Sequence, residues 1–239
     1  MNLFVQKHLP AAGYYVPAST RGQQWGQALI LADVAFLVLH LCLNFGLLGN
    51  RQFHLEVDMG YAELFQFLKL AVIIVLLLYL AMSNGAAVRV LMAAVMGFLL
   101  LEDAVGMHES FHLIGERFVT LRPWLGLSVQ HLWEVIYGFA VGGVLLGLLL
   151  LAVVNTDDDR LRQRMVVLLV LLVVYGLFGV VIDALHGLLQ HGKVSIYLES
   201  LFGTIEDWGE MITLSAITAL VIDDAYRTAS RKVLSGGPR

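Results

Sequence analysis

The sequence predicts an all-α integral membrane protein, a bundle of about six transmembrane helices. Its mean hydropathy is +0.78, and 59% of its residues are hydrophobic. Charged residues make up only 14% of the chain, whereas soluble domains carry about 25%. Several apolar runs reach the roughly 20 residues that a helix needs to cross a bilayer. Together these observations exclude an ordinary water-soluble domain.

Each expected helix is an apolar run that ends at polar or turn-forming residues. The links read SNG at 83–85, RPWLG at 122–126 and NTDDDR at 155–160. The resulting spans lie, in chain order, at about 25–48, 60–83, 86–117, 127–154, 165–191 and 198–226.

Lysine and arginine predict the orientation, because cytoplasmic loops are enriched in them. We therefore expect both termini in the cytoplasm, with 1–24 as an N-terminal segment, 25–226 as the bundle and 227–239 as a tail. Residues 1–24 lack the apolar core of a signal peptide. The basic residues on the side of the termini are Lys7, Arg21, Arg89, Arg160, Arg162, Arg164, Arg227, Arg231, Lys232 and Arg239.

Net charge and cysteine content limit the expected partners and metal ligands. The formal net charge is -4 and no long basic run is present, so we expect no nucleic-acid partner. The single cysteine, Cys42, excludes an intrachain disulfide and a thiolate cluster. A metal site would therefore use nitrogen and oxygen ligands.

Titratable residues recur at helical spacing in the half of the bundle opposite the termini. Glu109 and His112 lie three residues apart in the third span, as do Asp183 and His186 in the fifth. Residues three apart share a helix face. Glu102, Glu109 and Glu116 are seven apart, which predicts one polar stripe along an unbroken third span. Other candidates at a similar depth are Glu63, His108, His131, Glu134, Glu206, Asp207 and Glu210.

This pattern is similar to that of di-metal carboxylate bundles, which combine bridging carboxylates with Glu-x-x-His pairs. Carboxylate and imidazole ligands suit iron, manganese or zinc as the cofactor. Glu206 and Asp207 are the candidates for catalytic proton transfer. A proton or ion path without fixed metal, and interhelical hydrogen bonding, remain open. The expected metal ligands are Glu63, His108, Glu109, His112, His131, Glu134, Asp183, His186 and Glu210.

Buried charges elsewhere predict partners. Lys69 lies midway through the second span, where an opposite charge reduces the cost of burial. We expect it to approach Glu102 or Asp103, with Asp33 as a competitor. His40 is interpreted as a helix–helix hydrogen-bonding group.

Three segments resemble motifs in a group of bacterial multi-pass membrane proteins with no assigned activity. They are YAELFQFLK at 61–69, LEDAVGMHE at 101–109 and IEDWGEMI at 205–212. The resemblance implies a multi-pass protein of the bacterial inner membrane, and it implies no substrate. It draws attention to Glu63, Gln66, Asp103, His108, Glu109, Glu206, Asp207 and Glu210.

The expected function is that of a membrane metalloprotein acting on a lipid-like or quinone-like substrate, by oxidation or hydrolysis. Membrane lipids are the expected surroundings. One alternative is transport of protons or a divalent cation, although the apolar inner halves of the fourth and fifth spans count against a through-path. Another is an accessory subunit of a larger membrane complex.

Overall fold

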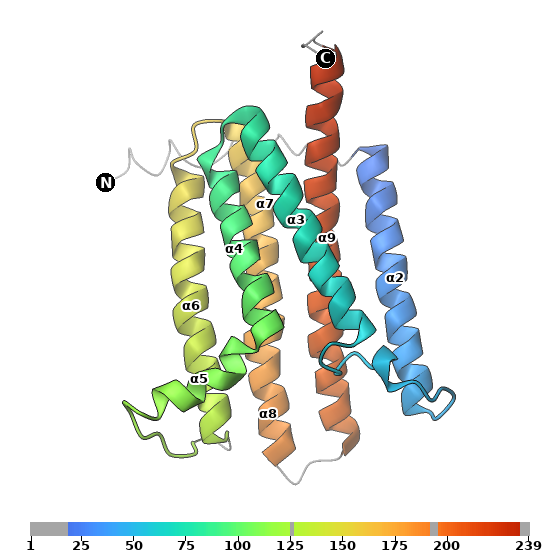
Figure 1. The fold of residues 1–239 in the computed structure, drawn as a ribbon, viewed down its shortest axis with the longest axis vertical. Coiled ribbons are helices and arrows are strands. Elements are labelled where there is room, and N and C mark those ends of the chain that lie inside the picture. Colours follow the sequence, from blue (N-terminus) through green and yellow to red (C-terminus); the bar gives the residue numbers. More distant parts are fainter. Residues whose placement is uncertain (1–18, 125–126, 192–195, 235–239) are drawn as a thin grey trace, which may run out of the picture.

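The computed structural model describes residues 19–124, 127–191 and 196–234, which form a bundle of long helices (Figure 1). Within these ranges the chain forms no β-strand, only an isolated bridge between Trp124 and Leu127. The all-α prediction is therefore confirmed. The elements are α2 (Thr20–Asn44), the 3-10 turn η1 (Arg51–Phe53), α3 (Tyr61–Asn84), α4 (Ala87–Val105), α5 (Met107–Gly115), α6 (Val129–Val154), α7 (Asp159–Gly176), the π-helical η2 (Leu177–Ile182), α8 (Asp183–His191) and α9 (Ile196–Leu234).

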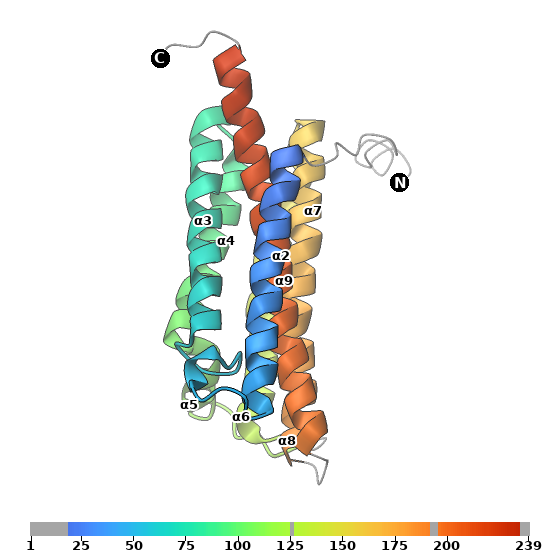
Figure 2. The ribbon, with the colours of Figure 1, turned by 90° about the vertical axis from the view of Figure 1, so that its right-hand side faces the viewer.

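Four helices of the described ranges are long and apolar enough to cross a membrane: α2, α3, α6 and the continuous rod Asp159–Leu189. Many of their apolar side chains face outward, such as Leu31 and Val144, which are 69% and 63% exposed. Both α4 and α9 run beside these helices (Figures 1 and 2), and α9 carries more charged residues than any of them. The count of six spans and the cytoplasmic position of the termini stay predictions.

Most of the other helices pack against α9. It contacts α2, α3, α7, η2 and α8. Figure 2 shows α2 lying beside it, and Figure 1 shows its C-terminal end projecting past the bundle. Residues of α9 therefore reach the interior along the whole length of the molecule.

Apolar side chains fill the half of the bundle next to the α3–α4 and α6–α7 turns. We call this the packed half, and we call the half that contains α5 and α8 the open half. Close packing of such side chains stabilises the bundle wherever helices, not lipid, are their neighbours. The large, fully buried apolar residues of this core are Leu70, Ile73, Leu77, Leu80, Met92, Met96, Leu149, Met165, Leu214 and Ile217.

Gly106 interrupts the expected third span. Its φ of 63° lies in the left-handed region that glycine adopts at little cost, and it separates α4 from α5. In Figure 1, α5 turns away from the axis of α4. The prediction of an unbroken helix over 86–117 is therefore wrong, and Glu102, Glu109 and Glu116 do not share one helical stripe.

The outer helices begin and end beyond the predicted boundaries. Ser19 caps α2, because its hydroxyl accepts a hydrogen bond of 3.1 Å from the backbone N–H of Gly22. This helix therefore starts at Thr20 and not near Trp25, and α9 continues to Leu234. The remainder of the two predicted terminal segments, 1–18 and 235–239, lies outside the described residues.

Candidate functional site

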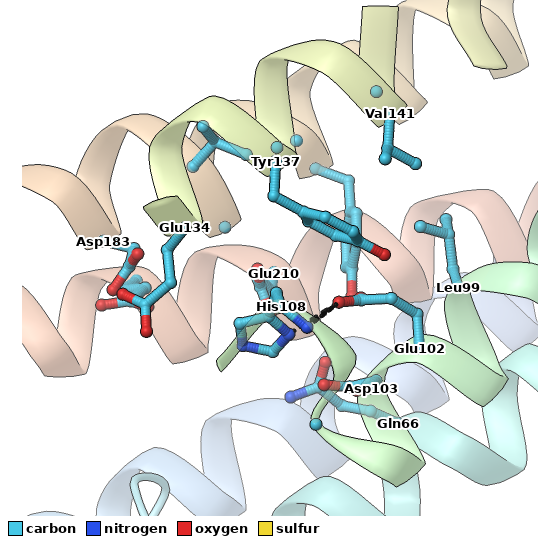
Figure 3. A pocket seen from close by; sticks show the side chains of 18 of the residues that line it. Gln66, Leu99, Glu102, Asp103, His108, Glu134, Tyr137, Val141, Asp183 and Glu210 are labelled. Carbon is cyan, nitrogen blue, oxygen red and sulfur yellow. Dashed lines mark hydrogen bonds and ion pairs between the residues drawn. The ribbon is translucent and has the colours of Figure 1, made fainter. Parts of the chain in front are cut away.

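A cavity of about 630 Å³ occupies the open half of the bundle, between α3, α4, α6, η2 and α9 (Figure 3). The imidazoles of His108 and His131 and the phenols of Tyr137 and Tyr175 line it. No lysine or arginine belongs to its lining among the described residues. We call it the acidic cavity, because its lining includes Glu56, Asp58, Glu63, Glu102, Asp103, Glu134, Asp183, Glu206, Asp207 and Glu210.

Helix α9 brings three of these carboxyl groups together, from Glu206, Asp207 and Glu210. Glu206 and Glu210 are one helical turn apart and therefore lie on the same face. The π-helical η2 passes opposite them, and a Cβ added at Gly179 would collide with Oε1 of Glu210. The glycine thus makes room for the acid, and π-helical segments are frequent at functional sites.

His186 contacts the Glu206 carboxyl and is not part of the cavity lining. Its Nδ1 is 3.1 Å from Oε2 of Glu206, which belongs to the lining. Gly203 permits this placement, since a Cβ there would lie 2.9 Å from the imidazole of His186. The predicted pair of Asp183 and His186 is therefore divided: Asp183 faces the cavity, and His186 contacts its wall.

The turn at Gly106 joins His108 to Glu102. The Nδ1 of His108 is 2.7 Å from Oε1 of Glu102, and the backbone N–H of His108 donates to the same oxygen over 3.1 Å. Figure 3 shows this contact at the centre of the cavity, with Asp103 beside it. The break in the helix thus folds the imidazole back onto a carboxylate six residues earlier.

On the opposite side of the cavity, α6 begins with a cap that also holds an imidazole. The backbone N–H of His131 donates to the Ser128 hydroxyl over 3.2 Å, and that hydroxyl is 2.6 Å from Nδ1 of the His131 ring. The ring lies against Gly187, where a Cβ would collide with it. Figure 3 places Glu134 beside Asp183 on this side.

The segment between α2 and α3 closes one side of the cavity and is tied to the bundle by His40. Nδ1 of this buried ring accepts a hydrogen bond of 3.2 Å from the backbone N–H of Leu55. Its Nε2 is 3.1 Å from the Thr204 hydroxyl on α9. The interpretation of His40 as a helix–helix hydrogen-bonding group is confirmed. Glu63, in the first turn of α3, accepts a hydrogen bond from the backbone N–H of Met59.

Lys69 does not approach Glu102 or Asp103, so that prediction is wrong. Its ammonium donates to Oδ1 of Asp33 over 2.7 Å and to the carbonyl oxygen of Met211 over 3.0 Å. The ion pair is fully buried between α2, α3 and α9. Asp33, which the sequence offered as a competing partner, is the residue that pairs with Lys69. This lysine therefore does not neutralise the carboxylates of the acidic cavity.

The structure gathers most of the predicted site residues at the acidic cavity but leaves some aside. His112 lies on α5 and is not part of the lining, and the Glu109 side chain lies outside the described part of the structure. Within the described residues, no group of three or more His, Cys, Asp and Glu side chains is arranged to hold a metal ion. The predicted residues that do line the cavity are Glu63, His108, His131, Glu134, Asp183, Glu206, Asp207 and Glu210.

The sequence predicted no ligand or catalytic role for four carboxyl groups of the lining, Glu56, Asp58, Glu102 and Asp103, although the motif resemblance draws attention to Asp103. The first two follow α2 in the polar segment that separates the first two predicted spans. The other two were expected to balance Lys69. A glycine between LEDAV and MHES was the available signal, since glycine is the residue most often found where a helix ends in a left-handed turn.

The comparisons with known proteins identify a family and no activity. No curated protein and no solved structure matches the chain. A family model described as a domain of unknown function (DUF8692) matches residues 29–223, a range that contains the whole lining of the acidic cavity. The chain therefore belongs to the DUF8692 family.

Proposed function

We propose that this protein is a membrane metalloprotein, in which the acidic cavity binds iron, manganese or zinc next to a lipid-like or quinone-like substrate. One observation carries the proposal: the described lining combines many carboxyl groups with imidazoles and contains no lysine or arginine. Glu102, Asp103, Glu134, Asp183 and Glu210 contribute from four different elements. Their charge has to be neutralised, by protons or by a bound cation, and we propose a metal ion.

The charged neighbours of the acids in the cavity support the proposal of a bound cation. The strongest charged neighbours of Glu210 are Asp103, Asp207, Glu206 and Asp183, which are all carboxyl groups. Like charges at short range in a poorly hydrated site repel one another, so these groups take up protons or bind cations. Oδ2 of Asp207 is buried and has no hydrogen-bond partner among the described residues.

The donor types fit the proposed metals, because carboxylate and imidazole together suit iron, manganese and zinc. Asp183 lines the cavity together with Glu134, His131 and His108. We propose Asp183, Glu134, His131 and His108 as ligands. A bound metal ion of this kind supplies Lewis-acid or redox chemistry to a substrate oxygen or to water.

Glu206 and Asp207 are proposed to accept and return the protons of the reaction. They line the cavity beside Glu210. His186, 3.1 Å from Glu206, holds the Glu206 carboxyl in position. On the same turn of α9, the Glu206 carboxyl is thus oriented by an imidazole, and Asp207 has a buried oxygen that accepts no hydrogen bond from the described part of the chain.

The shape of the cavity supports an amphiphilic substrate. Towards the packed half its lining becomes apolar and includes Val95, Leu99, Leu145, Leu146 and Leu172. A lipid or quinone could place its tail against this wall and its oxygen atoms among the acids. Ligand sites of this type combine an apolar wall with a few polar groups that fix orientation.

For the membrane placement, we propose that α4 with α5 and α9 also cross the bilayer, which makes six spans. They run beside the four apolar helices (Figures 1 and 2). Arg89, Arg160, Arg164 and Arg227 all lie at the end of the bundle where α2 begins. The preference of arginine for cytoplasmic loops supports cytoplasmic termini, and we propose the bacterial inner membrane as the location.

Two alternatives stay predictions. Transport of protons or a divalent cation needs a polar route through the packed half, where Ile73, Leu77 and Met92 are buried in the core. The accessory-subunit alternative requires a partner in a larger membrane complex. Both are separated from the first proposal by measuring metal content and assembly state.

Elemental analysis of the full chain tests the proposal. We expect at least one iron, manganese or zinc ion per chain after purification in mild detergent without chelators. Asp183→Asn should abolish metal binding, because Asp183 faces the cavity beside Glu134. The matched control is Glu116→Gln, an exposed acid at the end of α5, which should keep the metal. A wild-type protein without stoichiometric metal, or equal loss in the control, would contradict it.

A second experiment tests the substrate class. Val141 of α6 lines the cavity, so Val141→Trp should fill its apolar part and displace a co-purifying lipid or quinone. Val144 lies on the same helix and is 63% exposed, and Val144→Trp is the control. Organic extraction followed by mass spectrometry measures both. Equal amounts of amphiphile in the two variants would contradict the substrate proposal while leaving the metal proposal standing.

A further inference from the structure

A second pocket lies at the other end of the molecule, where α3, α4, α7 and α9 meet in the packed half. Its volume is about 210 Å³. We call it the arginine pocket. Its charged lining residues are Arg89, Arg160, Arg164, Arg227 and Arg231, with Asp158, Asp223 and Asp224.

Two aspartates hold the arginines at the base of the pocket in place. Arg89 donates to Oδ2 of Asp224 over 2.8 Å, and its side chain is 5% exposed. Arg164 is 3.0 Å from Oδ1 of the same aspartate. Arg227 donates through Nε to Oδ2 of Asp223 over 2.9 Å. These guanidinium groups therefore form a fixed base, with arginines outnumbering the carboxylates they share.

The arginines at the rim are left without such partners. Arg160 and Arg231 are exposed, and their guanidinium groups make no ion pair or hydrogen bond within the described residues. The nearby Asp158 is already engaged, because it accepts from the backbone N–H groups of Arg160 and Leu161 at the start of α7. The pocket consequently carries surplus positive charge at its opening.

We propose that the arginine pocket binds a phosphate-bearing anion, supplied either by a lipid head group or by free phosphate. Guanidinium groups match phosphate oxygens in charge and in hydrogen-bond geometry. Basic pockets between membrane helices are known to bind anionic head groups. Below the rim the wall contains Leu77, Leu80, Leu161 and Leu168, which would accommodate the first carbons of an acyl chain.

Binding assays on the full chain in a neutral detergent test this site. The probes are short-chain phosphatidic acid, inorganic phosphate and short-chain phosphatidylcholine, and the readout is the shift of Tm with probe concentration. The test variant is R160Q/R231Q. The matched control is R117Q/R122Q, which removes two exposed arginines from the opposite end of the bundle.

We expect a saturable rise in Tm with phosphatidic acid and little with phosphatidylcholine. R160Q/R231Q should raise the apparent Kd roughly 30-fold, the product of two arginine contacts at a membrane surface, and R117Q/R122Q should leave it unchanged. A matching response to inorganic phosphate would identify free phosphate as a sufficient ligand, and its absence would identify the lipid. No saturable response to either anion, or equal weakening in both variants, would overturn the proposal.

Discussion

Half-buried acids have opposite surroundings in the two halves of the bundle. In the packed half, Asp224 lies within 2.8 to 3.0 Å of Arg89 and Arg164. In the open half, Glu210 has other carboxyl groups as its strongest charged neighbours, and no lysine or arginine lines the described cavity. The chain therefore neutralises its own charge at one end and depends on protons or bound cations at the other.

The Lys69–Asp33 pair lies at the border between these halves. Lys69 is one helical turn from Gln66, which lines the acidic cavity, yet its ammonium points to Asp33. It also lies 4.4 Å from the centre of the Phe65 ring. The Lys69 ammonium thus lies near the acidic cavity but pairs with Asp33. The described lining lacks a positive side chain because of how the helices are packed, and not only because lysine and arginine are few in this part of the sequence.

The largest expected effect comes from breaking this border pair. Asp33→Ala should lower the free energy of unfolding by about 3 to 5 kcal/mol, because it leaves the Lys69 charge buried without its carboxylate. The control D33L/K69M removes both charges and should restore most of the stability. Denaturant unfolding in micelles, followed by circular dichroism, measures the difference. If Asp33→Ala were as stable as the wild type, the Lys69–Asp33 pair would not be buried as described.

A glycine-to-alanine pair tests how closely the open half is built around Glu210. Gly179→Ala should destabilise the protein by about 1 kcal/mol, because the added methyl collides with Oε1 of Glu210 and forces that side chain out of its rotamer. Gly147→Ala on α6 adds a methyl that has no atom of the described residues within 4 Å, and it should be neutral or slightly stabilising. Unfolding under the same conditions compares them. Equal effects would mean that η2 does not hold the acid in place.

Removing one charge from the open half should have opposite signs with and without metal. In chelator-treated protein, Glu210→Gln should raise the free energy of unfolding by about 1 kcal/mol, since it relieves repulsion among neighbouring carboxyl groups. In protein that contains metal the same change should lower stability. The corresponding change in the packed half, Asp224→Asn, should destabilise under both conditions, because it removes a partner of Arg89. If Glu210→Gln changed the free energy of unfolding in the same direction with and without metal, the proposed difference between the two halves would be wrong.

Much of the fold follows from the sequence because apolar length and polar links are local properties. The helices begin and end near the predicted positions for α3 and α6. The break at Gly106 was not predicted, since a glycine inside an apolar run is also compatible with a continuous helix. The π-helical η2 was not predicted either, because it depends on packing against α9 and not on a local signal.

The candidate site was predictable in its residue types and depth, but not in its partners. Acids on α9 and Asp183 reach the cavity because helical periodicity fixes their faces. The partner of Lys69 could not be predicted, because it depends on which helices pack together. Contacts between residues distant in sequence bring α2 against α3 and α9. The same reason separates His186, which contacts Glu206 from the wall, from Asp183, which lines the cavity.

The smallest expected change in stability comes from removing a helix-capping serine at either end of the bundle. Ser19 caps α2 in the packed half and Ser128 caps α6 in the open half. Each change to alanine should cost about 0.5 to 1 kcal/mol of stability. Only Ser128→Ala also releases the His131 ring from a contact of 2.6 Å, so it alone should weaken metal binding, by about tenfold. Metal titration followed by elemental analysis compares the two variants, and equal affinity in both would remove His131 from the proposed ligands.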